Sequence, residues 1–454
     1  MENKYTYYES TTSICNTCLK QITGKIIFED NKVYLLKRCS EHGVMKELLD
    51  HDIDYYKNKR KYDKPGTLSK TQTIYKNGCP YDCGLCTEHD QHSCITLIEV
   101  TNRCNLNCSM CYANAGDSKD LSLDKISEML DFVMEVEDNK AEILQISGGE
   151  PTLHKDIIRI IDLARNKDFK YVMLNTNGIR IAEDEEFVKE LSKFVGKFEV
   201  YLQFDGFNDE YYDLARGQKL LDIKLKAIDN LNKYNIPTTL VATIENGVND
   251  SEIGLLVSFG LENNSVRGIN FQPVAYFGRK EVPSNRLDRS TVTDIINKIE
   301  KQTSKVLVKK DFIPLPCNVE RVAISYLYKN KNSFVPLTRS DAVKEYLPYI
   351  NNTFAYTVED ALALGNEIKF GCCNTLDFLR DFKDFVPKGF MKWDKERRSK
   401  YVSDNTFRIS ITSFVDRYNF DLKSMQKECV HVVTKDLKRI PFSAYNMIYR
   451  DNDE

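Results

Sequence analysis

The hydrophobic and polar residues between positions 97 and 274 follow two alternating patterns. Short apolar runs typical of buried strands are separated by stretches in which apolar residues recur every three or four positions, as on one face of a helix. The predicted strands span residues 97–101, 142–147, 170–175, 198–204, 238–244 and 267–273. The predicted helices span residues 121–138, 154–167, 183–195, 217–234 and 250–262. This alternation predicts an α/β fold with a parallel sheet and right-handed crossovers.

Polar residues follow the carboxyl ends of several of these strands. Parallel sheets gather their functional residues at that edge, because the loops after successive strands meet there. The strand-end segments are Gly148-Gly149-Glu150 and residues 175–178, 203–206, 243–245 and 272–273. Five polar strand ends along one rim are more than chance turn chemistry would give, so their side chains are candidate ligand contacts. Each of these side chains, taken singly, is also compatible with a simple strand-end cap.

A cysteine triplet, Cys104-x3-Cys108-x2-Cys111, directly follows the first predicted strand. Three soft thiolates in one loop suit three irons of a 4Fe–4S cluster. The fourth iron has no local cysteine, so it is open to the amino and carboxylate groups of a methionine-derived ligand. Glu150 is a candidate charge-assisted partner for that amino group. The alternative is a zinc knuckle or a set of unmetallated thiols.

A second triplet with the same spacing precedes the first strand. With a further cysteine downstream it provides four thiolates, which predicts a closed auxiliary 4Fe–4S cluster. These four residues are Cys79, Cys83, Cys86 and Cys94. Only the later triplet follows a strand and precedes the Gly-Gly-Glu turn, so we assign the open cluster to that one. We expect His89 and His92 to be solvated loop residues, because four thiolates suffice; a zinc site is the alternative.

The first 62 residues form a separate predicted module. Cys15-x2-Cys18 and Cys39-x2-His42 flank an alternating stretch, residues 25–37, that predicts a β-hairpin. Three thiolates and one imidazole suit a tetrahedral zinc ion or a rubredoxin-like iron. We expect a structural role, because such a closed site leaves no position for substrate. The alternative is an incomplete site in which His42 is only a turn residue.

Composition limits the class of protein. The chain has 454 residues, 42% of them apolar, and a formal net charge of −3, which does not favour nucleic-acid binding. We find no secretory signal and no apolar run long enough to span a membrane, so we expect a cytoplasmic protein. Fourteen cysteines in such a chain indicate metal ligation. The predicted domains are residues 1–62, 63–96, 97–310 and 311–454.

The cysteine loop 104–111, followed after the next strand by Gly148-Gly149-Glu150-Pro151, resembles the radical S-adenosylmethionine (SAM) superfamily. The resemblance implies a partial (β/α)6 barrel, here with an N-terminal metal module, an auxiliary cluster segment and a C-terminal α+β extension. It implies that Gly148, Gly149, Glu150, Asn177 and Gln203 contact SAM and that Met110 packs near its adenine. Asp205 and Glu245 are then the candidates for catalytic residues, as contacts of substrate or ribose.

The order of motifs narrows the resemblance to one family. The N-terminal module and the two triplets are followed by distinctive segments at residues 201–207, 245–250, 271–274, 314–317, 416–421 and 440–446. Together they resemble the tetraether lipid synthases and class D radical SAM methylases of pterin-cofactor biosynthesis. The resemblance implies reductive cleavage of SAM to a 5′-deoxyadenosyl radical and carbon–carbon bond formation, by methylation or coupling. It also implies a small-molecule or lipid substrate and an electron donor such as ferredoxin or flavodoxin.

The chain departs from this family near its C-terminus. Family members carry a further cluster with one ligand in a Pro-Phe-Cys segment, where this chain has Ser443. Glu428 precedes a single cysteine, Cys429. The remaining C-terminal cysteines are Cys317, Cys372, Cys373 and Cys429. Cys317 and Cys429 are therefore the candidates for a third cluster, and buried free thiols are the alternative.

Two other functions are compatible with the sequence. One is a radical SAM maturase that modifies a peptide, since such enzymes also carry auxiliary clusters. The other is a non-enzymatic iron–sulfur or zinc scaffold. Cleavage of SAM by the reduced protein excludes the scaffold.

Overall fold

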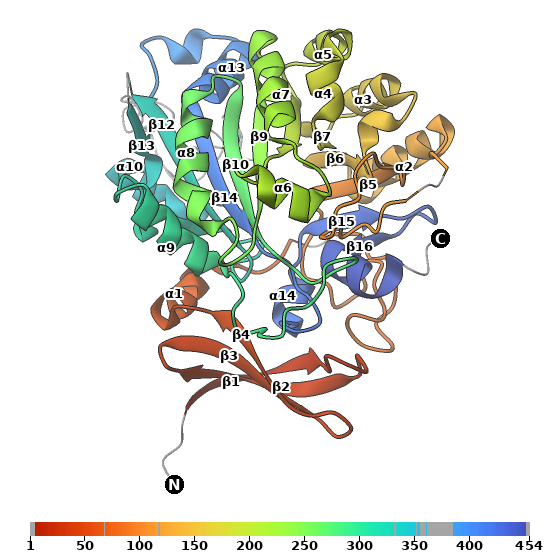
Figure 1. The fold of residues 1–454 in the computed structure, drawn as a ribbon, viewed down its shortest axis with the longest axis vertical. Coiled ribbons are helices and arrows are strands. Elements are labelled where there is room, and N and C mark those ends of the chain that lie inside the picture. Colours follow the sequence, from red (N-terminus) through yellow and green to blue (C-terminus); the bar gives the residue numbers. More distant parts are fainter. Residues whose placement is uncertain are drawn as a thin grey trace, which may run out of the picture.

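The chain folds into two sheets, and the segment between them begins with the short helix α1 (Ile53–Asn58) (Figure 1). The computed structural model describes residues 5–450 except 68, 117–118, 331–332, 351, 355–359 and 361–384. A small antiparallel sheet at the N-terminal end lies below a large sheet that carries helices. Within the described residues, no helix is both long enough and apolar enough to cross a membrane.

The small sheet is antiparallel, with strand order β1-β2-β3-β4. Its strands are β1 (Thr6–Ile14), β2 (Gln21–Glu29), β3 (Lys32–Cys39) and β4 (Gly43–Asp50). The predicted hairpin is its central pair, and Asp30 and Asn31 turn between β2 and β3 with φ of 51° and 59°. Positive φ at both central residues is the geometry of a tight hairpin turn. The outer strands β1 and β4 extend the sheet beyond the prediction.

The six predicted strands of the barrel are present and pair in parallel in sequence order. They are β5 (Ile95–Thr101), β6 (Ile143–Gly148), β7 (Tyr171–Thr176), β8 (Phe198–Gln203), β9 (Thr238–Ile244) and β10 (Val266–Pro273). The predicted helices correspond to α2 (Leu123–Val136), α3 (Ile157–Arg165), α5 (Glu185–Ser192), α7 (Leu221–Lys233) and α8 (Ile253–Glu262). Two short helices at strand ends, α4 (Ile179–Glu183) and α6 (Asp209–Arg216), were not predicted.

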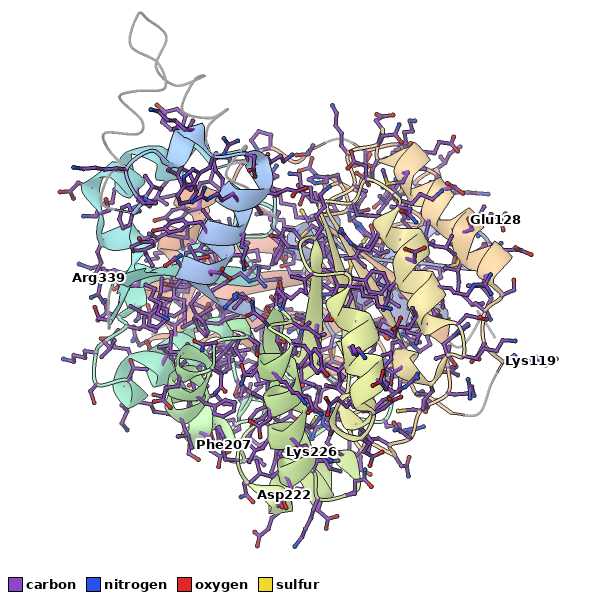
Figure 2. All side chains as sticks on the ribbon, turned by 90° about the horizontal axis from the view of Figure 1, so that it is seen from above. Lys119, Glu128, Phe207, Asp222, Lys226 and Arg339 are labelled. Carbon is purple, nitrogen blue, oxygen red and sulfur yellow. The ribbon has the colours of Figure 1, made fainter. Side chains whose placement is uncertain are left out.

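The helices cover the sheet with their apolar faces and present charge outward. On α2, Glu128 is exposed whereas Met129 and Leu130 are buried. On α7, Asp222 and Lys226 project away from the sheet (Figure 2). The core between the layers is a continuous apolar cluster that draws on every strand from β5 to β10. Burial of this cluster positions the strand ends, and with them the candidate site.

The C-terminal segment adds strands to both edges of the barrel sheet. On one edge, β14 (Thr406–Thr412) pairs in parallel with β10, and β12 (Val322–Asn330) follows it in antiparallel orientation. On the other edge, β15 (Val430–Val433) pairs in parallel with β5, and β16 (Arg439–Pro441) follows. The large sheet therefore continues across the boundary that we predicted at residue 310. Its edges are β11 (Ile313–Pro314) and β16, with β13 (Ser333–Pro336) paired to β12.

The remaining elements are short and connect these layers. The α-helices are α1 (Ile53–Asn58), α9 (Val292–Gln302), α10 (Asp341–Tyr346), α13 (Lys395–Asn405), α14 (Leu422–Gln426) and α15 (Phe442–Ala444). The single turns are η1 (Lys59–Tyr62), η2 (Pro151–Leu153), η3 (Asp250–Glu252), η4 (Lys309–Asp311), η5 (Leu337–Arg339), η6 (Leu347–Tyr349), η7 (Phe390–Lys392) and η8 (Tyr445–Tyr449).

Candidate functional site

The loop after β5 carries Cys104, Cys108 and Cys111, all partly exposed. Burial raises the pKa of Cys104 to about 11, and the negative charges of Glu150, Cys108 and Cys111 act in the same direction. The three thiols and Glu150 therefore lie within electrostatic range of one another. A bound metal favours the thiolate form, and soft sulfur ligands suit iron–sulfur clusters. The loop thus has the donor set that a 4Fe–4S cluster requires.

Two glycines at the end of β6 allow the Gly-Gly-Glu turn to lie against the chain that leads into this loop. Gly149 N donates to Thr101 O at 2.9 Å, and Glu150 N donates to Arg103 O at 2.8 Å. A Cβ on Gly149 would lie 2.3 Å from Arg103 O, and one on Gly148, where φ is +133°, would lie 2.1 Å from Thr101 O. Both positions require glycine because backbone atoms occupy the space of a side chain.

The carboxylate of Glu150 is buried and held by several donors. Its Oε1 accepts hydrogen bonds from Thr152 N at 3.0 Å, Thr152 Oγ1 at 2.7 Å and Thr176 Oγ1 at 2.8 Å. Its Oε2 accepts one hydrogen bond from the described residues, from Asn177 N at 2.7 Å. A carboxylate oxygen has two lone pairs, so Oε2 retains capacity for another donor. Glu150 is therefore a fixed anionic acceptor at the edge of the cysteine loop.

Asn177 ties the end of β7 to the cysteine loop. Its Nδ2 donates to Asn105 Oδ1 at 2.7 Å, and its Oδ1 accepts from Ile179 N at 3.0 Å, at the start of α4. The structure thus brings Asn177, Glu150 and the cysteine loop together, as expected from their strand-end positions. A direct contact between Asn177 and SAM stays a prediction.

Lys224 of α7 is a buried cation that the sequence analysis missed. Its Nζ donates to Asn177 O and to Gln203 Oε1, each at 2.6 Å, so it connects two of the predicted residues. Burial lowers its pKa to about 7, and the negative charge of Asp205 opposes that shift. A signal was present in the sequence: Lys224 lies on the same helical stripe as three buried apolar residues, Ala227, Ile228 and Leu231.

The two predicted acidic candidates are each paired with a cation of the protein. Asp205 is fully buried and accepts hydrogen bonds from Arg216 Nε at 2.8 Å and Nη2 at 3.0 Å. It also accepts from Thr243 N at 3.0 Å and from Gln203 Nε2. Glu245 accepts from Lys280 Nζ at 2.7 Å and 2.9 Å. These contacts give Asp205 a positioning role between β8, α6 and β9, and a catalytic role for either residue stays a prediction.

Other contacts connect the cysteine loop with α6 and with the segment after β10. Met110 Sδ accepts a hydrogen bond from Tyr211 Oη at 3.9 Å, and the same hydroxyl contacts Thr243 O at 3.3 Å. After β10, Arg279 N donates to Cys111 O at 3.0 Å, and its guanidinium donates to Asn107 Oδ1 at 2.8 Å. The loop is thus held between α6 and the segment after β10.

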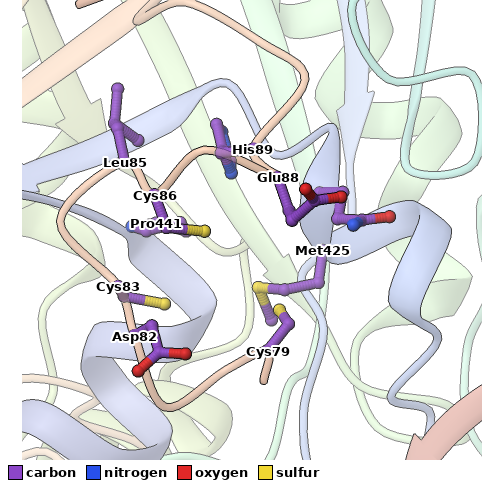
Figure 3. Close-up of a pocket in the computed structure, with 10 residues that line it drawn as sticks. Cys79, Asp82, Cys83, Leu85, Cys86, Glu88, His89, Met425 and Pro441 are labelled. Carbon is purple, nitrogen blue, oxygen red and sulfur yellow. The ribbon is translucent and has the colours of Figure 1, made fainter. Parts of the chain in front are cut away.

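The other triplet lies in a more apolar environment. The thiols of Cys79, Cys83 and Cys86 border one cavity, together with Met425 and Pro441 (Figure 3). Burial raises the pKa of all three thiols. This cavity has the soft donors of an iron–sulfur site, and apolar side chains form part of its wall.

The prediction that Cys94 completes this cluster is wrong in its geometry. Cys94 directly precedes β5, and β5 pairs in parallel with β15 in a register that sets Ile95 opposite Val430. Cys94 and Cys429 are therefore adjacent, and Ile95 N donates to Cys429 O at 3.0 Å. The sulfurs of Cys94, Cys317 and Cys429 lie within 4.8 Å of one another. Strand pairing, which the local spacing did not reveal, moves Cys94 to the third group.

This third group has the properties of a metal site. All three cysteines are buried. Hydrogen bonds from Cys429 and Cys94 lower the pKa of Cys317 to about 5, which favours its thiolate.

His92 Nε2 lies 3.8 Å from Cys94 Sγ. His92 is thus buried, contrary to the prediction of a solvated residue. Cys372 and Cys373 lie outside the described residues.

The N-terminal module brings together the four residues that the sequence selected. The ligand atoms of Cys15, Cys18, Cys39 and His42 lie within 4.8 Å of one another. Cys18 Sγ and Cys39 Sγ are 3.9 Å apart, and His42 Nδ1 lies 3.5 Å from Cys39 Sγ. A tetrahedral ion with metal–sulfur bonds of about 2.3 Å separates its sulfurs by about 3.8 Å. The arrangement fits one metal ion.

Comparison with known proteins identifies the family. The radical SAM superfamily matches residues 98–260, and the HMPTM N-terminal zinc ribbon domain matches residues 7–51. The 7,8-dihydro-6-hydroxymethylpterin dimethyltransferase of Methanocaldococcus jannaschii is 35% identical, over 98% of this chain and 95% of that protein. The chain belongs to the radical SAM family of this dimethyltransferase. Membership confirms the predicted partial barrel and implies a 4Fe–4S cluster and SAM as cofactors.

Other relatives share a smaller part of this radical SAM enzyme. The mycofactocin maturase MftC of Mycolicibacterium smegmatis is 29% identical over 34% of this chain and 38% of its own length. Among solved structures, Streptococcus suis SuiB matches with a TM-score of 0.40 at 17% identity, over 47% of each chain. The enzyme cleaves SAM reductively and forms carbon–carbon bonds, as the sequence predicted, and the scaffold alternative is set aside.

Proposed function

We propose that this radical SAM enzyme methylates a carbon atom of a reduced pterin: the 5′-deoxyadenosyl radical removes a hydrogen atom from that carbon and leaves as 5′-deoxyadenosine, and a one-carbon donor supplies the methyl group. The observation that carries the proposal is the 35% identity to the pterin dimethyltransferase, because it extends over nearly the whole of both chains. The likeness includes the N-terminal zinc ribbon as well as the barrel. If the two proteins had only the barrel chemistry in common and acted on different substrates, the segments outside the barrel would be free to diverge.

The residues of the barrel rim have separable roles in this proposal. Cys104, Cys108 and Cys111 hold three irons, and Glu150 receives the amino group of SAM on Oε2, which accepts a single bond within the described part of the protein. Lys224 fixes the position of Gln203 through its 2.6 Å hydrogen bond. A 4Fe–4S cluster bound there supplies the electron that cleaves SAM. We propose a ferredoxin or flavodoxin as the source of that electron.

Three other groups of cysteines in the described residues bind metals away from the SAM site. We propose an auxiliary cluster at Cys79, Cys83 and Cys86, whose thiols border one cavity. We propose a further metal at Cys94, Cys317 and Cys429, supported by the closeness of their sulfurs. A zinc or iron ion at Cys15, Cys18, Cys39 and His42 stabilises the ribbon.

The substrate proposal is tested with the anaerobically reconstituted enzyme, 7,8-dihydro-6-hydroxymethylpterin, a chemical reductant, excess SAM and, as the other possible one-carbon donor, a methylene-carrying reduced pterin. We expect 5′-deoxyadenosine together with a pterin product whose mass has increased by one or two methyl groups. The Cys104→Ala variant should form neither product. Formation of 5′-deoxyadenosine with an unchanged pterin would overturn the substrate and leave the radical chemistry intact.

The peptide maturase alternative receives less support. The maturase relative matches about a third of this chain. The N-terminal module belongs instead to a zinc ribbon, in which a metal site occupies one end of the four-stranded sheet.

A further inference from the structure

The cavity of the auxiliary triplet contains a nitrogen donor beside its three thiols. His89 lies three residues after Cys86 and borders the same cavity as Cys79, Cys83 and Cys86 (Figure 3). Its ring is only partly buried, in contrast to the fully buried His431 beside it. The backbone turns at this point, since His89 N donates to Cys86 O at 3.0 Å. The imidazole therefore belongs to the wall of the cavity.

The hydrogen bonds of His89 define which ring nitrogen is free. Its Nε2 lies 3.0 Å from Glu428 O, and a backbone carbonyl can only accept, so Nε2 carries the proton. His431 Nε2, 3.1 Å away, can share that proton as an acceptor, because His431 Nδ1 can donate to Ser93 Oγ at 2.9 Å. In the neutral ring, Nδ1 of His89 then has a lone pair. It makes no hydrogen bond within the described part of the chain.

We propose that His89 Nδ1 is the fourth protein ligand of the auxiliary cluster held by Cys79, Cys83 and Cys86. The inference rests on the auxiliary cluster proposed above. Metal-bound histidines commonly donate their other N–H to a carbonyl or carboxylate, which fixes the ring orientation. The bond from His89 to Glu428 O provides this arrangement. The cluster is closed by an imidazole in place of the sulfur of Cys94, which the sheet holds elsewhere.

Other polar groups near the cavity are less suited to this position. Asp82 already accepts hydrogen bonds from three backbone amides, of residues 76, 77 and 78. Glu88 is exposed. Ser443 Oγ accepts from Val415 N at 2.9 Å. Glu428 Oε2 is buried and has no hydrogen-bond partner among the described residues, so it is the competing oxygen ligand, although Glu428 does not border the cavity.

The test uses full-length protein labelled with ¹⁵N-histidine in a Cys104→Ala/Cys108→Ala/Cys111→Ala background, reconstituted anaerobically. Pulsed EPR of the reduced protein should show strong ¹⁵N coupling to a cluster. His89→Ala should abolish that coupling. His89→Cys should abolish it while retaining the iron content, and should lower the reduction potential because a thiolate replaces a neutral ligand. His51→Gln is the control. His51 contacts Thr291, which is distant in sequence from the cysteine triplet, so this variant should preserve the coupling.

The auxiliary cluster and its ligand are tested separately. Cys79→Ala/Cys83→Ala/Cys86→Ala should remove about four irons per chain, as expected for one cubane cluster. If the iron content does not fall, the auxiliary cluster itself is disproved. If it falls but ¹⁵N coupling is absent from the parent, or persists in both His89 variants, the assignment of His89 is wrong. A spectrum that changes in Glu428→Gln but not in His89→Ala would assign the ligand to the carboxylate and also overturn the proposal.

Discussion

The two Cys-x3-Cys-x2-Cys loops have the same spacing but opposite surroundings. The thiols of Cys104, Cys108 and Cys111 are partly exposed at a polar strand edge, with the buried carboxylate of Glu150 beside them. Cys79, in contrast, is part of an apolar cluster that includes Leu97 and Phe442. Ligand spacing therefore determines which ion or cluster a loop can hold, whereas the surrounding elements determine what that cluster can do.

The difference arises from the elements that pack against each loop. The later loop is fixed to the ends of β6 and β7 through Arg103, Asn105 and the Gly-Gly-Glu turn. Largely buried Arg216 and fully buried Lys224 lie within electrostatic range of Cys108. The earlier loop borders a cavity with Met425 and Pro441 of the C-terminal segment.

The largest expected effect separates the two loops directly. Cys104→Ala should abolish SAM cleavage, because it removes a ligand of the cluster that binds SAM. Cys79→Ala should retain cleavage within about tenfold and lose the methylated product. The measurement is 5′-deoxyadenosine and product formation by mass spectrometry under anaerobic conditions. If Cys79→Ala abolished cleavage and Cys104→Ala did not, the assignments of the two loops would have to be exchanged.

A smaller effect is expected from the glycines that bring β6 against the later loop. Gly149→Ala should decrease SAM cleavage by at least about tenfold, because its Cβ would overlap Arg103 O and displace the loop. It should also lower the free energy of unfolding by about 2 kcal/mol. Gly116→Ala, in the segment that follows Cys111, is the control, since an added Cβ meets no atom of the described residues within 4 Å. Equal activities of the two variants would show that this close approach is dispensable.

The smallest effect concerns the buried charge of the SAM site. Burial lowers the pKa of Lys224 to about 7 in the folded protein, whereas the ordinary lysine value is 10.5. Between these values the unfolded chain binds one more proton, so unfolding takes up a proton and stability rises with pH. Lys224→Met should therefore reduce the rise in unfolding free energy between pH 8 and 10 by about 1 kcal/mol per pH unit.

Urea unfolding at a series of pH values measures this slope. Lys226→Met, a change at an exposed residue of the same helix, is the control and should leave the slope unchanged. Identical slopes in Lys224→Met and the parent would mean that Lys224 stays protonated in the folded protein over this pH range.

Local patterns predicted the barrel well because strand and helix periodicity are properties of neighbouring residues. All six parallel strands were predicted within a few residues, and Glu150 and Asn177 lie beside the cysteine loop as expected from strand-end positions. The errors involve contacts between distant segments. Cys94 was assigned to the cysteines nearest in sequence, although the pairing of β5 with β15 sets it beside Cys429.

The side chains of His89 and Lys224 also show that local patterns do not reveal contacts between distant segments. His89 was expected to be solvated because four local thiolates seemed sufficient, and that reasoning fails once Cys94 is elsewhere. Lys224 was part of an apolar helical stripe, but its acceptors, Asn177 O and Gln203 Oε1, come from two other strand ends. A buried polar group can be understood only when its partners are known.

The sequence by itself determined the parallel barrel, the two cysteine triplets, the zinc ribbon ligands and the radical SAM chemistry, because each depends on residue types at short, regular spacings. Only the tertiary structure decided that Cys94 lies beside Cys317 and Cys429, and which side chains lie beside each cysteine group. The reason is physical: ligation and hydrogen bonding depend on distances in space, and here sheet pairing between β5 and β15 sets the distances between residues that lie more than three hundred positions apart.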